Sequence, residues 1–165
     1  MRKEKRIVLN DRGRELKFKI KEMSALQLER WIVKAGLLLA GSGILDATMA
    51  SGDAGDVIAK AGKVISNEGL SALTKLDFDK AEPLLDDLLG CCSHIAEGGV
   101  ETRLTSGIVD GIVEDVRTLF QLRKEALALN LGFFVNAGQS DFENSGTPSP
   151  ARSARKISVR SQDLS

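Results

Sequence analysis

The chain has 165 residues, of which 42% are hydrophobic and 28% are charged, so it can bury a core as one domain with an appendage. Aromatic residues make up only 4%, which favours a core of aliphatic side chains and helices over a sheet. No apolar run reaches the roughly 18 residues of a membrane span, and the basic start is followed by too few apolar residues for a secretory signal. Two adjacent cysteines without others predict a reducing, intracellular location.

The formal net charge of zero hides a division along the chain. Residues 1–21 carry nine Lys or Arg against three Asp or Glu, residues 22–137 carry ten against seventeen, and residues 138–165 carry four against three. A basic segment on an acidic body can fold back on that body or offer two faces to two partners. We expect no nucleic-acid partner, because the body is acidic and aromatic side chains are scarce.

The first 21 residues predict a β-hairpin. Apolar residues at 7–9 and alternating apolar residues at 16–20 flank a turn at 10–13 that contains Gly. One face of this hairpin is apolar, and the other carries lysines at alternate positions. A lone hairpin is only marginally stable in water, so its apolar face should pack on the helix that follows.

Residues 24–40 predict the best-defined helix of the chain. Ser24 and Gln27 have the identities and spacing of a capping box, and Met23 stands where a hydrophobic staple belongs. Apolar residues then recur every three or four positions, which is typical of a helix with one buried face. This face comprises Leu28, Trp31, Ile32, Ala35 and Leu39.

Three more helices are expected further along, over residues 53–69, 77–95 and 105–132, because each range combines a capping residue with apolar residues at helical spacing. Residues 44–49 predict a loop or a weak short helix. In the last and longest helix the predicted buried ridge comprises Ile108, Ile112, Val116, Leu119 and Phe120, with Leu127 as a further candidate. The fold class is therefore mainly α: a small helical bundle with an N-terminal β-hairpin.

Beyond residue 137 the composition changes to Gly, Ser, Asn and Pro with few apolar residues. Such a segment cannot offset its ordering entropy by burial, so we divide the chain into a hairpin plus helical domain, 1–137, and a flexible polar tail, 138–165, disordered or extended. Within the tail, Ile157 and Val159 alternate with polar residues and could add a strand to a partner's sheet. The alternative is a solvated tail without a role.

The nearest thing to a reactive cluster is the segment 91–94, which holds both cysteines and the only histidine. Zinc requires four ligands at chelating spacings, whereas neighbouring thiols on a helix point apart, and further ligands would have to be carboxylates such as Asp86 or Asp87. A thiol nucleophile with His94 two or three residues away also has poor geometry, because catalytic pairs meet across a fold. We expect packed or half-exposed side chains.

Two other patterns match ligand-binding motifs only superficially. Residues 36–43 have glycines spaced as in a phosphate-binding loop, but Ser42 stands where a Lys is needed and a helix precedes it. The acidic residues between 77 and 87 lack the alternation of a calcium loop. We therefore assign no residue to catalysis, to a cofactor or to a metal, and we expect that the protein is not an enzyme.

The order of these parts resembles a known family. Its features are a hairpin, a helix begun by Met23–Leu26, an acidic helix ended by Asp86–Leu89, a long helix containing Thr118–Leu122, and an end at Asn130–Phe134. Over residues 7–135 this pattern resembles the tail assembly chaperones of long-tailed bacteriophages and their prophages. The resemblance implies a non-enzymatic protein of the bacterial host cytoplasm that binds the tape-measure protein, recruits tail-tube subunits and leaves before the tail is complete.

The resemblance also implies self-association into a homo-oligomer, and longer variants made by frameshifting. For a helical client, large apolar side chains are the expected contacts, since aromatic anchors dominate such interfaces. Each aromatic anchor could equally be ordinary core. The expected partner-binding residues are Trp31, Phe120, Phe133, Phe134, Ile157 and Val159. The alternative function is a small cytosolic adaptor or regulator whose basic hairpin binds nucleic acid or an acidic protein partner.

Overall fold

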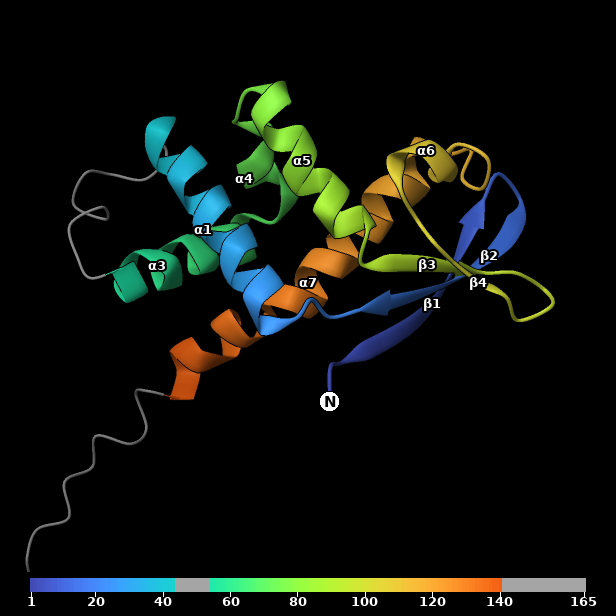
Figure 1. The fold of residues 1–165 in the computed structure, drawn as a ribbon, viewed down its shortest axis with the longest axis horizontal. Helices are drawn as coiled ribbons and strands as arrows, with labels where there is room; N and C mark the ends of the chain where they lie inside the picture. The colour runs from blue at the N-terminus through green and yellow to red at the C-terminus, as the bar shows by residue number, and fades with distance from the viewer. Residues whose placement is uncertain (44–53, 141–165) are drawn as a thin grey trace, which may run out of the picture.

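The computed structural model describes residues 1–43 and 54–140, which form a four-stranded antiparallel sheet and six helices (Figure 1). The strands are β1 (Glu4–Asp11), β2 (Arg14–Lys21), β3 (Cys92–Ile95) and β4 (Glu101–Arg103), and they lie in this order across the sheet. The helices are α1 (Ala25–Gly41), α3 (Ala54–Glu68), α4 (Leu70–Thr74), α5 (Phe78–Leu89), α6 (Ser106–Val109) and α7 (Val116–Ser140). The described fold is thus mainly helical with an N-terminal hairpin, as the sequence predicts.

The predicted hairpin is confirmed. Strands β1 and β2 pair in register up to Asp11 and Arg14, which leaves Arg12 and Gly13 as a two-residue turn. Both turn residues have positive φ, 50° and 89°, as the tight turns that match strand twist require. On the opposite end of β2, Phe18 and Ile20 are fully buried and anchor the hairpin to the core.

The predicted helix over residues 77–95 is wrong in its last third. Helix α5 ends at Leu89, and residues 92–95 form β3, which pairs with β2. The second hairpin strand would otherwise expose unpaired backbone groups, and β3 satisfies them. A hydrogen bond from Lys21 N to Cys91 O (2.9 Å) extends this pairing, and one from Leu104 N to Cys92 O (2.9 Å) extends the pairing of β3 with β4. Local periodicity cannot reveal such a distant partner.

The predicted continuous helix over residues 105–132 is also wrong, because it is two helices separated by a turn. Helix α6 is a single turn, and α7 begins only at Val116 and continues to Ser140. The interruption is held by Asp11 from the hairpin tip: its carboxylate accepts hydrogen bonds from the backbone N–H of Glu114 (3.0 Å) and of Asp115 (2.9 Å). Asp11 thus caps the start of α7 from a different element of the fold. The sequence around residue 110 therefore cannot predict this cap.

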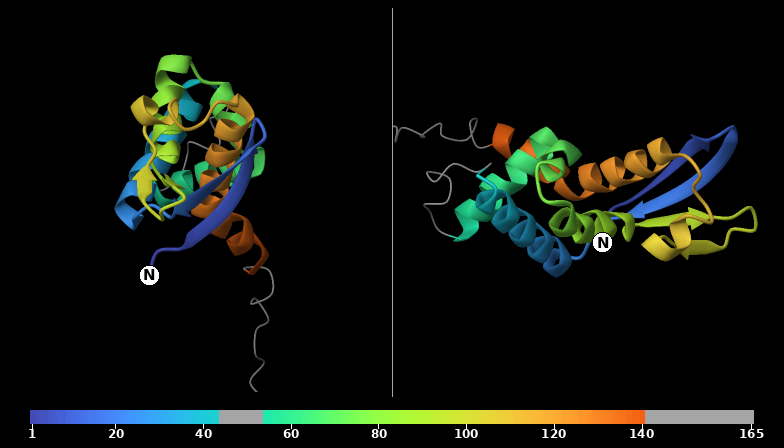
Figure 2. Two further views of the ribbon diagram at one scale, coloured as in Figure 1. Left: turned by 90° about the vertical axis from the view of Figure 1, so that its right-hand side faces the viewer. Right: turned by 90° about the horizontal axis from the view of Figure 1, so that it is seen from above.

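Helix α7 connects two different ends of the molecule (Figures 1 and 2). We call the four strands with α6 and the start of α7 the sheet end, and α1, α3 and α4 the helical end. Helix α7 packs against β1 and β2 at the first and against α3 and α4 at the second, and α5 lies alongside it between them. Strands β1 and β4 are the two edges of the sheet.

The predicted helix 24–40 is confirmed in its cap and its buried face. Ser24 and Gln27 form a reciprocal capping box, and Trp31, Ile32, Ala35 and Leu39 are buried. The predicted helix 53–69 corresponds to α3; the capping role of its first residue, like the segment 44–49, lies outside the described residues. The core is built mainly from Leu, Ile, Val and Ala.

Candidate functional site

Cys91 and Cys92 lie where α5 ends and β3 begins, and neither thiol is activated as a nucleophile. Burial raises the pKa of Cys91 to about 11, although a hydrogen bond from Asn130 and the charge of Arg103 lower it. Burial, with the neighbouring Cys91, raises the pKa of Cys92 to about 12. Both therefore remain protonated at neutral pH, whereas a nucleophilic or metal-binding thiol must lose its proton readily.

His94 does not complete a catalytic pair with these thiols. It stands opposite Phe18 in the pairing of β2 with β3, and the two ring centroids are 5.6 Å apart. The described residues contain no group of three or more His, Cys, Asp or Glu that could hold a metal ion. Residues 92–94 lie in strand β3 of the sheet, and Cys91 is the turn residue that precedes it.

The predicted contact residue Trp31 is buried. Only 3% of its surface is exposed, and its indole Nε1 donates a hydrogen bond to the backbone oxygen of Leu84 at 3.1 Å. This bond satisfies the one polar atom of the ring inside the core, where an unpaired N–H would be costly. Trp31 thus joins α1 to α5, and little of it is available to a partner.

Two predicted contact residues in the second half of α7, Phe133 and Phe134, have neighbouring, mutually tilted rings. Phe133 is 43% exposed, whereas Phe134 is partly buried, and their ring centroids are 4.1 Å apart. The Phe134 ring covers Gly62 of α3 so closely that a Cβ atom there would stand 2.8 Å from it. Phe134 therefore serves packing, and Phe133 faces outward. The tail residues Ile157 and Val159 lie outside the described residues.

At the start of α7 the predicted buried ridge is partly wrong. Val116 and Phe120 are 61% and 52% exposed, and they lie one turn apart on the same side of the helix. Ile108 on α6 is also exposed. The packing face of α7 instead contains Leu122, Ala126 and similar residues, because the turn at 110–115 changes the phase of the helical pattern.

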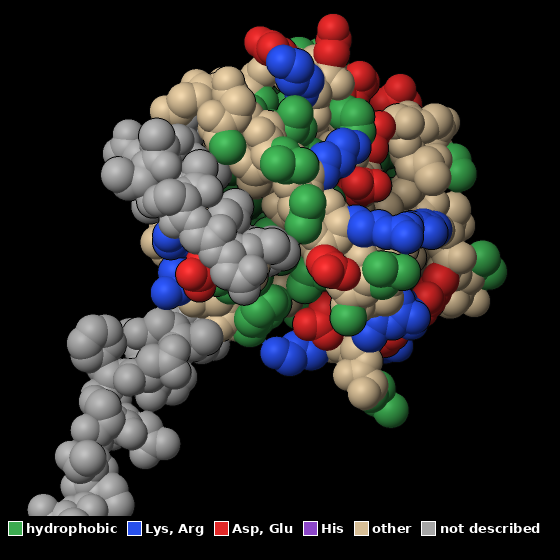
Figure 3. All heavy atoms as spheres, turned by 60° about the vertical axis from the view of Figure 1, so that its left-hand side comes forward, with side chains coloured by type: hydrophobic (Ala, Val, Ile, Leu, Met, Phe, Trp, Pro, Cys, Tyr) green, Lys and Arg blue, Asp and Glu red, His purple; other side chains and the backbone are tan. Residues whose placement is uncertain are grey.

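Helix α1 has a second apolar face that the sequence analysis missed. Leu26, Val33 and Leu37 are 55%, 36% and 67% exposed, and their spacing of seven and four places them in one line along the helix. We call these three residues the α1 stripe. It runs opposite the buried face, so α1 is apolar on both sides, which the spacing could have revealed. Figure 3 shows apolar side chains among charged ones on the side of the molecule that carries α1 and α3.

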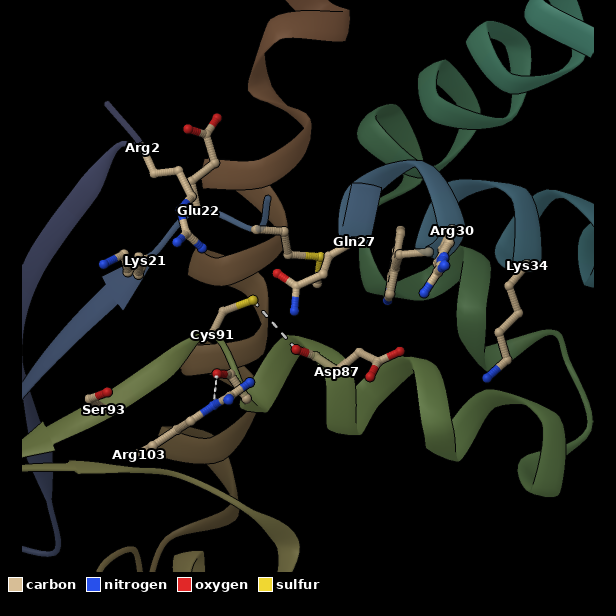
Figure 4. A pocket seen from close by; sticks show the side chains of 13 residues that line it. Arg2, Lys21, Glu22, Gln27, Arg30, Lys34, Asp87, Cys91, Ser93 and Arg103 are labelled. Atoms are coloured by element: carbon tan, nitrogen blue, oxygen red, sulfur yellow. Dashed lines mark hydrogen bonds between the residues drawn. The ribbon is translucent and has the colours of Figure 1, made fainter. Parts of the chain in front are cut away.

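A cavity of about 520 Å³ opens between the end of β2, α1, and the junction of α5 with β3 (Figure 4). Its wall contains Met23, Trp31 and Cys91, which give it an apolar part. Around them stand charged side chains from five parts of the chain. These are Arg2, Lys21, Glu22, Arg30, Lys34, Asp87 and Arg103.

Four cations of the hairpin pair with carboxylates, whereas Arg6, Arg12 and Lys17 take part in none of the ion pairs found among the described residues. Lys5 lies 2.7 Å from Glu125 of α7, and Arg14 lies 2.9 Å from Glu114. Lys19 pairs with Glu101 of β4, and Lys21 pairs with Glu4 at 3.2 Å. The basic segment has therefore folded back on the acidic body, which leaves less positive charge for an external partner than the sequence suggests.

No family model, no curated protein and no solved structure matches this chain. No helix among the described residues is long and apolar enough to cross a bilayer.

Proposed function

We propose that this protein is a non-enzymatic assembly chaperone that binds a helical client through apolar helix surfaces. Following the resemblance to phage tail assembly chaperones, the client is a tape-measure protein, to which the chaperone recruits tail-tube subunits. The observation that carries the proposal is the α1 stripe. Amphipathic helices bind grooves and other helices through anchors spaced by four and seven residues, and the stripe offers this spacing on a helix that is already held by the core.

A second exposed pair supports the same function. Val116 and Phe120 are apolar, more than half exposed and one turn apart at the sheet end of α7. Exposed side chains of this size in an ordered helix mark interaction sites when they group together. The raised pKa of both thiols also speaks against catalysis by these cysteines, which are the most reactive candidates among the described residues.

Coexpression with the tape-measure protein encoded in the same phage or prophage genome tests this proposal. The client should be more soluble with the protein than without it, and the two should co-purify. Leu26→Ser combined with Leu37→Ser should abolish co-purification, because two of the three anchors of the α1 stripe are lost, including the two largest. Phe78→Ser is the matched control, since Phe78 is 68% exposed but lies at the start of α5, away from the stripe.

Two results would contradict the proposal. One is a client that is equally soluble alone and does not co-purify with the unaltered protein. The other is binding of duplex or single-stranded nucleic acid that weakens steeply with salt, which would instead favour an adaptor acting through its basic hairpin.

A further inference from the structure

The cavity beside α1 carries an excess of positive charge. Five of its lining residues are Lys or Arg, and two are Asp or Glu. Lys21 is paired with Glu4, but the ion pairs found among the described residues include none of Arg2, Arg30, Lys34 and Arg103. Four hairpin cations have carboxylate partners, namely Lys5, Arg14, Lys19 and Lys21. The cavity therefore brings together several cations that lack such a partner among the described residues.

Arg103 is held in place at the rim of the cavity. Its Nε donates a hydrogen bond to the backbone oxygen of Gly90 at 2.7 Å. A Cβ atom at Gly90 would stand 3.1 Å from Nη2 of Arg103, so the missing side chain lets the guanidinium lie close to the backbone. Arg103 reaches in from β4, whereas Arg30 and Lys34 reach in from α1 (Figure 4). A guanidinium fixed through Nε keeps its outer N–H groups for a carboxylate or phosphate.

The cationic cavity is continuous with the α1 stripe. Arg30 lies between Leu26 and Val33 in sequence, and at 3.6 residues per turn both it and Lys34 lie beside the stripe on the helix surface. A ligand that contacted both the α1 stripe and the cavity would need an apolar edge and, beside that edge, an acidic one. A small phosphate compound would use the cations and leave the stripe uncovered, so the combination favours a protein segment.

We propose that this cavity binds Asp or Glu side chains along one edge of an amphipathic helix of a partner, whose apolar edge lies on the α1 stripe. The carboxylates would pair with Arg30 and Lys34 on one side and with Arg103 on the other. The inference rests on the proposed function in one respect, namely that α1 holds a protein client, and it adds the chemistry of the client segment.

The test uses the full chain and two synthetic helical peptides with the same Leu pattern. One peptide has Glu beside the Leu edge, and the other has Gln at the same positions. Trp31 is the only Trp and lines the cavity, so its fluorescence reports on the site, and calorimetry gives the affinity independently. We expect the Glu peptide to bind at least about tenfold more tightly, as for a charge-assisted hydrogen bond gained.

The double substitution Arg30→Gln with Lys34→Gln should remove this preference. Both side chains are exposed, so the fold should be unaffected. The control is Lys17→Gln with Lys124→Gln, which removes two exposed cations outside the cavity and should change the preference by less than about twofold.

Several outcomes would overturn the inference: binding of neither peptide, equal affinity for both, or loss of the preference in the control. Pyrophosphate that bound more tightly than the Glu peptide and displaced it would make this a phosphate site instead. Client co-purification without any peptide preference would refute only the cavity, whereas a peptide preference without client co-purification would refute only the chaperone function.

Discussion

The two ends of the molecule are held together by different forces. At the sheet end, the fully buried carboxylate of Asp11 accepts hydrogen bonds from two backbone N–H groups at the start of α7. At the helical end, α1 and α3 approach so closely that a Cβ atom on Gly36 would stand 2.9 Å from the Cβ of Ala61. At the sheet end, hydrogen bonds fix the start of α7. At the helical end, close steric fit fixes α1 against α3.

This difference determines which changes each end tolerates. A buried polar anchor is sensitive to loss of an acceptor, because its donors are then left unsatisfied away from water. A close helix contact is sensitive to a single added methyl group, because neither backbone can move without disturbing the packing behind it. The four substitutions or conditions below test the contrast.

The largest effect should come from Asp11→Ala. It leaves the N–H groups of Glu114 and Asp115 without their acceptor, and the free energy of unfolding should fall by about 3 kcal/mol. Urea denaturation measures this change. Asp79→Ala is a suitable control, since Asp79 is an exposed acidic residue near the start of α5 and should change stability by less than about 0.5 kcal/mol. A loss for Asp11→Ala no greater than the control's would refute the anchor.

Gly36→Ala should have the next largest effect, a loss of about 2 kcal/mol, because the new methyl group would collide with Ala61. In an unconstrained helix the same change is stabilising. Gly132→Ala on α7 provides that comparison, since a Cβ there meets nothing within 4 Å and should add up to about 1 kcal/mol. Thermal unfolding of both variants measures the two changes in stability. A stabilisation by Gly36→Ala like that by Gly132→Ala would disprove a close α1–α3 contact.

The pH dependence of stability should distinguish the two ends. Burial raises the pKa of Asp11, but the hydrogen bonds from Glu114 N–H, Asp115 N–H and Thr118, together with the charge of Arg14, lower it more, so its folded pKa lies below the usual 3.8. Asp11 therefore stabilises the fold above pH 3.8, and this contribution is lost as the pH falls through the lower folded pKa. Denaturation of the wild type and of Asp11→Ala between pH 6 and about pH 3 should show the difference shrinking toward acid. A difference independent of pH would exclude a charged anchor.

The smallest effect should be a gain. Arg12 has φ of 50°, a left-handed conformation that a long side chain adopts only at a cost. Arg12→Asn gives the Asn-Gly pair that such hairpin turns prefer, and it should raise the free energy of unfolding by about 0.5 kcal/mol. Chemical denaturation at high precision checks it. Arg6→Asn, an exposed position inside β1, should bring no such gain.

The sequence predicts those elements whose signals are local. The capping box of Ser24 and Gln27 and the Gly-containing turn at 10–13 lie within a few residues of the structure they specify, and both are confirmed. Strand β3 was missed because it pairs with β2, more than seventy residues earlier in the chain, and β4 was missed because it depends on β3. The interruption before α7 was missed for the same reason, since its cap is Asp11.

The candidate surfaces were predictable to a smaller extent. Phe120 and Phe133 are exposed, as a contact role requires, whereas burial of Trp31 follows from its place in the apolar repeat of α1. The α1 stripe could have been found from spacing alone. The cavity could not, because it brings together Arg2, Arg30 and Arg103, and only the tertiary fold shows that these three positions meet.

The edge position of β1 has a consequence for how copies of this protein could meet. This strand has eight residues, and only β2 pairs with it in the described sheet. Another chain that extended the sheet there would lie against Glu4, Lys5 and Arg6 and would have to strip water from them. Growth of the sheet from one molecule to the next is thereby discouraged at this edge.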